Sequence, residues 1–174
     1  MRIDIKKTRV YPFAELTDEA KQTALEQLAD INVDHEWWDF TYEDAANVGI
    51  KITGFDLGRG SYCHGDFTLD VEEIANKIIA EHGESCETYK TAIEFLAEIY
   101  NLRNDFMLSD DDLDEEDFEL SDTYEDAVDE FKYSILEDYR IMLQHEYEYM
   151  TSEEAIIETI EANEYEFTAD GKLY

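Results

Sequence analysis

The stretch Ser109–Glu119 constrains the fold of this chain most strongly, because eight of its eleven residues are carboxylates and no Lys or Arg interrupts it. Carboxylates are almost never fully buried unless they are paired, so this stretch must lie at the surface. We therefore interpret the rest of the chain as a scaffold that holds a negative surface in shape.

The charge of the whole chain is extreme and uneven. Its 46 acidic and 13 basic residues give a net charge of −33. Residues 109–174 hold 24 acids and 3 bases, a net charge of −21, against −12 for residues 1–108. Self-repulsion of this size destabilises a compact state, yet 44% hydrophobic and 13% aromatic residues supply enough material for a core. We expect a folded protein that makes use of its charge.

Such a surface repels phosphates, which excludes direct binding to nucleic acid. It attracts basic surfaces, and nucleic-acid-binding proteins carry those. The N-terminus lacks the apolar region of a signal peptide, and no apolar run approaches the ~20 residues of a membrane span. Together with only two cysteines, Cys63 and Cys86, these features predict a cytoplasmic protein that does not enter the membrane.

Hydrophobic patterns predict a helix-rich α+β fold. An N-terminal strand over 3–13 and a hairpin over 50–71, with strands 50–55 and 66–71, would form one small antiparallel sheet packed by about six helices. Helices are predicted to begin at the caps Thr17 and Asp34 and to cover 71–80, 85–102 and 121–150. A further helix restarts over 151–154 and runs to about Ala162, and a short terminal hairpin follows over 165–174. The apolar side of the helix over 85–102 is expected to consist of Tyr89, Ile93, Leu96, Ala97 and Tyr100.

We expect a single domain over residues 1–174, since neither half has much core to spare. Within it, residues 1–108 form an α+β part and residues 109–120 an acidic connection. Residues 121–174 form an acidic helical part that ends in the short hairpin.

Rows of carboxylates on the predicted helices suggest phosphate mimicry. Asp122, Asp126 and Glu130 stand at i, i+4 and i+8 and would repeat every ~6 Å. Such like-charge rows cost helix stability, so structure alone does not favour them. Duplex DNA carries one charge per ~1.7 Å, so an excess of 33 charges matches about 56 Å, or roughly sixteen base pairs. The residues predicted to bind a partner as phosphate mimics are Asp110, Asp111, Asp112, Asp114, Glu115, Glu116, Asp117, Glu119, Asp122, Glu125, Asp126, Asp129, Glu130, Glu154, Glu158 and Glu161.

A calcium loop is the first alternative for the acidic stretch. Asp110, Asp112 and Asp114 match the first three ligand positions of an EF-hand. Position six, however, is Glu115, where the sharp turn of the loop requires Gly. The pattern therefore does not favour a Ca²⁺ site.

A zinc site is the second alternative, since Cys63, His64, His82 and Cys86 are the right ligand types for tetrahedral Zn²⁺. Adjacent Cys63 and His64 cannot form the usual Cys-x2–4-Cys chelate, so the spacing argues against it.

Trp37 and Trp38 stand among several acids, and carboxylates beside aromatics are typical of glycoside hydrolases. In a chain with 46 acids such pairs arise by chance, and one Trp in the core with the other at its edge is the simpler interpretation. The chain contains no Gly-x-Ser-x-Gly, His-Glu-x-x-His or Walker motif. We expect no enzymatic activity, no metal and no cofactor.

The segments 15–21, 30–38 and 42–45, together with 143–149 and 161–167, resemble a group of small uncharacterised proteins from phage and prophage genomes. The resemblance spans nearly the whole chain and implies a phage origin. Small acidic accessory proteins of phages are similar in character to DNA-mimic inhibitors of host restriction or CRISPR systems.

Charge and resemblance together predict a phage-encoded inhibitor that acts in the host cytoplasm on a basic nucleic-acid-binding defence enzyme, either a Cas effector or a restriction nuclease. Rows of carboxylates would occupy its DNA-binding cleft, and aromatic residues such as Tyr124, Tyr147 or Trp38 would fill contacts between them. The alternative is an antitoxin-like or adaptor module that masks a basic surface without imitating DNA.

Overall fold

The computed structural model of the protein describes residues 8–109 and 114–174. The chain forms two compact units. Residues 1–37 and 145–174 make up one, called here the terminal unit, and residues 38–144 make up the other, the central unit. The predicted helix-rich α+β fold is confirmed, but the unit boundaries differ from the predicted parts 1–108, 109–120 and 121–174.

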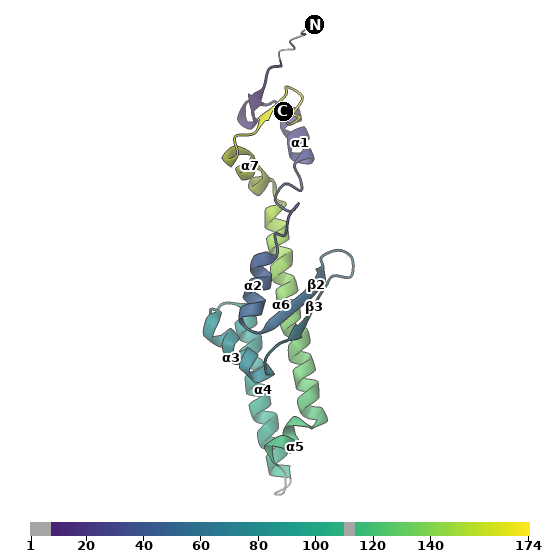
Figure 1. Ribbon diagram of the computed structural model, residues 1–174, viewed down its shortest axis with the longest axis vertical. Coiled ribbons are helices and arrows are strands. Elements are labelled where there is room, and N and C mark those ends of the chain that lie inside the picture. Colours follow the sequence, from purple (N-terminus) through teal and green to yellow (C-terminus); the bar gives the residue numbers. More distant parts are fainter. Residues whose placement is uncertain (1–7, 110–113) are drawn as a thin grey trace, which may run out of the picture. The chain divides into compact units, whose positions relative to one another are not determined.

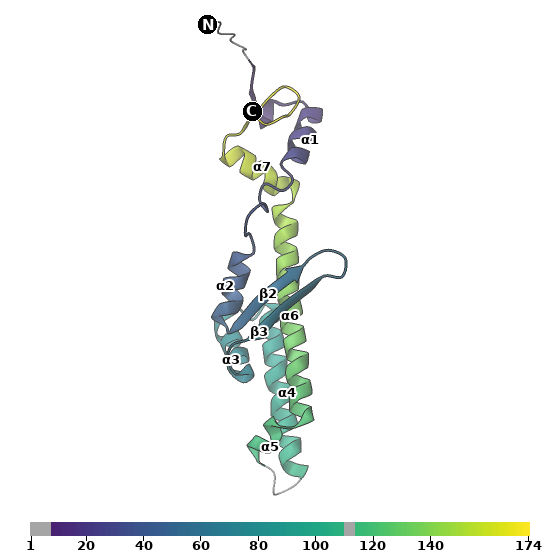
Figure 2. The ribbon, with the colours of Figure 1, turned by 45° about the vertical axis from the view of Figure 1, so that its right-hand side comes forward.

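The central unit is a helical assembly with one β-hairpin. Its elements are α2 (Asp39–Asn47), β2 (Ile50–Asp56), β3 (Tyr62–Phe67), α3 (Val71–Glu81), α4 (Glu87–Ser109), α5 (Glu115–Glu119) and the first part of α6 (Asp122–Met150). Antiparallel α4 and α6 lie side by side, and the hairpin lies against α6 (Figure 1, Figure 2).

The hairpin was predicted correctly in its first strand and wrongly in its second. β3 ends at Phe67, which pairs with Ile50, whereas the predicted strand covered 66–71. Gly65 lies inside β3 because the backbone of Lys51 approaches it closely, and an added Cβ would lie 2.9 Å from the Lys51 carbonyl oxygen. Asp70 instead caps α3, accepting hydrogen bonds from the Glu72 and Glu73 N–H groups.

Part of the core of the central unit lies between α4 and α6. The Phe95 and Phe131 rings stack with centroids 4.3 Å apart. Tyr139 is fully buried, and its hydroxyl donates a hydrogen bond to Asp44 Oδ2 at 3.1 Å. The predicted apolar side of α4 is wrong, because Ile93 and Tyr100 are exposed. The side that packs consists of Thr88, Ala92, Phe95 and Ile99.

The terminal unit joins the two ends of the chain. Its elements are β1 (Tyr11–Pro12), η1 (Phe13–Glu15), α1 (Asp18–Gln27), the end of α6, α7 (Glu153–Ala162) and β4 (Glu166–Phe167). β1 pairs with β4 in a sheet separate from the hairpin, so the N-terminal strand does not extend the β2–β3 sheet as predicted.

Local signals account for the ends of these elements. The Thr17 side chain caps α1 as predicted, accepting from the Ala20 N–H. The predicted cap at Asp34 is wrong, since the second helix, α2, begins only at Asp39. Gly49, with φ 95°, ends α2 as expected. In the terminal hairpin Phe167 pairs with Leu173, and Gly171, with φ 82°, approaches the backbone of Ala20.

Candidate functional site

The end of the acidic stretch is an ordered helix and not an irregular connection. Asp114 and Asp117 form a capping box that begins α5. The Phe118 side chain is fully buried, 5.5 Å from the Phe106 ring and 5.3 Å from the Tyr124 ring. Its burial fixes α5 and keeps the carboxylates of Asp114, Glu115, Glu116, Asp117 and Glu119 at the surface. The predicted residues Asp110, Asp111 and Asp112 lie outside the described residues.

Arg103 on α4 holds α5 in place. Its Nε lies 2.6 Å from Glu115 Oε1, its Nη2 contacts Glu72, and its guanidinium lies over the Phe118 ring at 5.5 Å. Glu115 is therefore a structural ion-pair partner as well as a predicted phosphate mimic.

The predicted row on α6 faces outward. Asp122, Glu125, Asp126, Asp129 and Glu130 are all exposed. The buried residues of this part of α6 form its other side, namely Ala127, Phe131 and Ile135. None of the five carboxylates has an ion-pair partner within the described part of the chain.

A second row, which the sequence analysis missed, lies on α4 beside this one. Glu94 and Glu98 of α4 and Glu130 of α6 line a groove of about 150 Å³ between the two helices, together with Thr91 and Ser134. Phe95 and Phe131 are the remaining lining residues. This arrangement, called here the acidic groove, brings carboxylates from two helices to one channel.

Asp138 lies close to the acidic groove. Its Oδ2 accepts a hydrogen bond of 2.6 Å from Thr91 Oγ1. Burial raises the pKa of the Asp138 carboxyl, and the nearby carboxylates of Glu87, Glu137 and Glu94 raise it further against the lowering effect of the Thr91 hydrogen bond. Burial first, and the neighbouring carboxylates second, therefore disfavour the charged form of Asp138.

The basic residues of these helices are already engaged. Lys90 pairs with Glu87 at 2.6 Å, Lys132 with Asp66 at 3.7 Å and Arg140 with Glu137 at 2.7 Å, in addition to the two pairs of Arg103.

Residues 87–144 hold 19 acids and 4 bases, a net charge of −15. The 23 residues of α4 extend for about 35 Å. One turn of duplex DNA has a similar length and carries about 20 charges.

The aromatic residues predicted to contact a partner are half-buried and pack on other rings. Tyr124 is half-buried against Phe118, and burial, with Asp70, Glu72 and Glu119, raises its pKa to about 12. Tyr147 packs on Trp37 and Trp38 packs on Phe55, each at 5.7 Å between centroids. Near the α6 row, Tyr133 is a more exposed aromatic residue, with 74% of its surface accessible.

The remaining predicted mimics, Glu154, Glu158 and Glu161, are exposed on α7. They belong to the terminal unit, whereas the candidate site consists of the acidic groove, the α6 row and α5 in the central unit.

The cysteine and histidine side chains considered as zinc ligands have different surroundings. Cys63 is buried, and burial, with Glu137, raises its thiol pKa to about 11. His64 stacks on Tyr62 at 4.4 Å, and Cys86 is exposed. Among residues 8–109 and 114–174, no group of three or more His, Cys, Asp or Glu side chains is placed to hold a metal ion.

One arrangement has the order of a catalytic triad. His82 Nδ1 lies 2.8 Å from Thr88 Oγ1, and its Nε2 lies 3.5 Å from Asp44 Oδ2. Thr88 is only 2% exposed, so its hydroxyl is out of reach of a substrate. We interpret the group, with Tyr139, as a partly buried network that joins α2, α3, α4 and α6.

No family model, curated protein or solved structure matched the chain. No helix in the described ranges is long and apolar enough to cross a bilayer. The functional conclusion therefore depends on the geometry and charge of the site.

Proposed function

We propose that the protein is a phage-encoded DNA mimic that inhibits a host nucleic-acid-binding defence enzyme, a CRISPR effector or a restriction nuclease. The observation that carries the proposal is the acidic groove. Exposed carboxylates of α4 and α6 meet along it, while every basic residue of 87–144 is held by an acid of the same unit.

In this proposal the helices supply what a duplex supplies to a basic cleft. Their rigid rows hold negative charges at regular spacing over about one helical turn of DNA. Arg and Lys side chains of the cleft would meet Glu94, Glu98 and Glu130 in the groove and the α6 row beside it. Complementary potentials would accelerate association and make it sensitive to salt.

Preorganisation supports the proposal over an adaptor that presents a linear acidic peptide. In the described part of the acidic stretch, a capping box and the buried Phe118 ring fix the carboxylates on a helix. A rigid surface loses less entropy on binding than a flexible tail does. An antitoxin-like module without DNA mimicry remains the alternative, and competition with DNA distinguishes the two.

The test is DNA cleavage by a panel of purified restriction nucleases and CRISPR effector nucleases, each titrated with the full-length protein. We expect inhibition of at least one enzyme that is competitive with a sixteen-base-pair duplex and that weakens as salt rises. Addition of the protein after the enzyme–DNA complex has formed should inhibit much less.

A charge-matched pair of variants separates the groove from bulk charge. The variant Glu94→Gln/Glu98→Gln/Glu130→Gln should lose most of the inhibition. The control Glu43→Gln/Glu81→Gln/Glu84→Gln removes the same charge from exposed positions of the central unit outside α4, α5 and α6 and should retain it. Inhibition that neither duplex nor salt alters would reject mimicry, and equal losses in both variants would reject the groove.

A further inference from the structure

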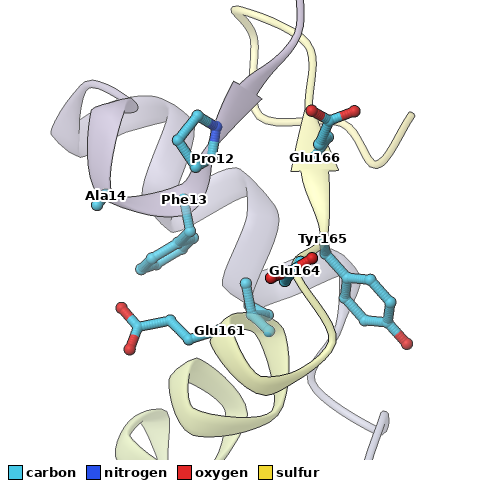
Figure 3. Close-up of a pocket in the computed structure, with 8 residues that line it drawn as sticks. Pro12, Phe13, Ala14, Glu161, Glu164, Tyr165 and Glu166 are labelled. Atoms are coloured by element: carbon cyan, nitrogen blue, oxygen red, sulfur yellow. The ribbon is translucent and has the colours of Figure 1, made fainter.

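The terminal unit contains a cavity of about 380 Å³ that the proposed function does not use. Figure 3 shows the residues that line it arriving from two parts of the chain, Pro12, Phe13 and Ala14 from β1 and η1, and Glu161, Glu164, Tyr165 and Glu166 from the end of α7 and β4. The volume is at the lower end of ligand cavities, which suits one large side chain better than a cofactor.

The lining of this cavity combines an apolar interior with an acidic rim. Phe13 and Ile160 are buried, and Tyr165 is half-buried. Glu161, Glu164 and Glu166 are exposed and, within the described residues, have no ion-pair partner. No basic residue lines the cavity. An apolar group would fill the space, and a cation next to it would meet the rim.

The backbone at Glu164 is also unusual. Its φ is 53°, and it is the only non-Gly residue with positive φ among those described. The Tyr165 N–H donates to the Ile160 carbonyl and the Glu164 N–H to the Glu161 carbonyl, each at 3.1 Å, which is a Schellman motif that usually has Gly at this position. A carboxylate is thus held at the rim where Gly would be the more stable choice.

We propose that this cavity binds an apolar side chain of a partner protein that has Lys or Arg on both sides of it. The apolar side chain enters between Phe13 and Ile160, and the flanking cations pair with Glu161, Glu164 and Glu166. Charge complementarity argues for this occupant and against a second copy of a chain with a net charge of −33. The inference does not depend on the proposed DNA mimicry, and it gives Glu161 a different role from phosphate mimicry.

The test is NMR titration of the full-length protein with the capped tripeptide Lys-Leu-Lys. We expect chemical-shift changes at Phe13, Ala14 and Tyr165 that saturate. The capped peptides Lys-Ser-Lys, without the apolar group, and Glu-Leu-Glu, with reversed charge, should bind at least roughly 10-fold more weakly.

Two variants place the binding in the cavity. Ala14→Trp fills it from an exposed position and should abolish the shifts. Glu161→Gln/Glu164→Gln/Glu166→Gln should weaken binding by roughly 10-fold, whereas Glu158→Gln, one turn away on α7, should not.

No saturable shifts, or equal binding of the Ser and Leu peptides, would overturn the proposal. Shifts that appear only after deletion of residues 2–7 would also overturn it, because the chain itself would then be the occupant. None of these outcomes bears on nuclease inhibition.

Discussion

Exposed carboxylates line two different features of this protein, a groove in the central unit and a cavity in the terminal unit. In the central unit, Glu94, Glu98 and Glu130 line a narrow groove between two long helices. In the terminal unit, Glu161, Glu164 and Glu166 surround a larger and mainly apolar cavity. The comparison shows that a count of acids does not define a binding site. What the acids enclose decides whether the surface suits an extended basic cleft or a single side chain.

The two units also keep their carboxylates in place by different means. In the central unit a buried aromatic ring, Phe118, and the ion pairs of Arg103 hold α5. In the terminal unit, short segments meet through backbone contacts at Gly171 and Glu164. Substitutions at these positions should therefore affect one unit at a time.

The largest effect on stability is expected for Phe118→Ala, which would disrupt the central unit. Removal of a fully buried ring should lower the free energy of unfolding by about 4 kcal/mol and release α5 from α4. Chemical denaturation measures the loss, and proteolysis near α5 reports its release. Phe118→Leu should cost much less, and a loss below about 1 kcal/mol for the Ala variant would contradict the observed packing.

A smaller loss of stability is expected for Gly171→Ala, which would disrupt the terminal unit. The new Cβ would lie 2.1 Å from the Ala20 carbonyl oxygen at a φ of 82°, so we expect a loss of about 3 kcal/mol from strain and overpacking. Gly60→Ala is the matched control, because its φ of 86° is similar but the space around it is open. It should cost only about 1 kcal/mol; equal losses would show that the turn does not pack against α1.

Glu164→Gly should have opposite effects on stability and on binding in the terminal unit. It relieves a positive φ at the end of α7 and should raise the free energy of unfolding by about 1 kcal/mol, while weakening the binding of Lys-Leu-Lys. Glu158→Gly, inside the same helix, should instead destabilise by about 1 kcal/mol. Thermal denaturation and the peptide titration measure the two effects.

The smallest effect is expected from Asp138, which tests the raised pKa of a carboxyl near the acidic groove. Its pKa is raised in the folded protein, so the folded state holds this proton more tightly than the unfolded chain does. The resulting stability is present in full below the unfolded pKa of about 4 and is lost as pH rises through the folded pKa. Asp138→Asn should therefore reduce the fall in stability between about pH 4 and pH 7. An unchanged pH profile would contradict a raised pKa for the Asp138 carboxyl.

Much of the fold was predictable from the sequence because its signals are local. The Thr17 cap, the helix end at Gly49 and the long α6 helix depend on neighbouring residues only. The pairing of β1 with β4 was not predictable, because it joins residues 11–12 to 166–167 and leaves no local pattern. The register of β3 also depends on a tertiary contact, the close approach of Lys51 to Gly65.

The sequence predicted the α6 row of the candidate site but not the row on α4. The α6 row was found because its acids repeat at helical spacing beside a clear apolar stripe. Apolar residues occur around much of α4, and Ile93 and Tyr100 were therefore assigned to its buried side. Because of this error, the exposed row of Glu94 and Glu98 on α4 was not predicted. Their spacing of four residues was the available signal, but only the packing of Phe95 on Phe131 shows which way they face.

The division of the chain between Trp37 and Trp38 has a practical consequence. These are the only two tryptophans, and one belongs to each unit, with Trp37 against Tyr147 and Trp38 against Phe55. The protein therefore contains one intrinsic fluorophore for each half. Single-tryptophan versions made with Trp37→Phe or Trp38→Phe would report the melting of each half by its own emission and would show whether the halves unfold together or one after the other.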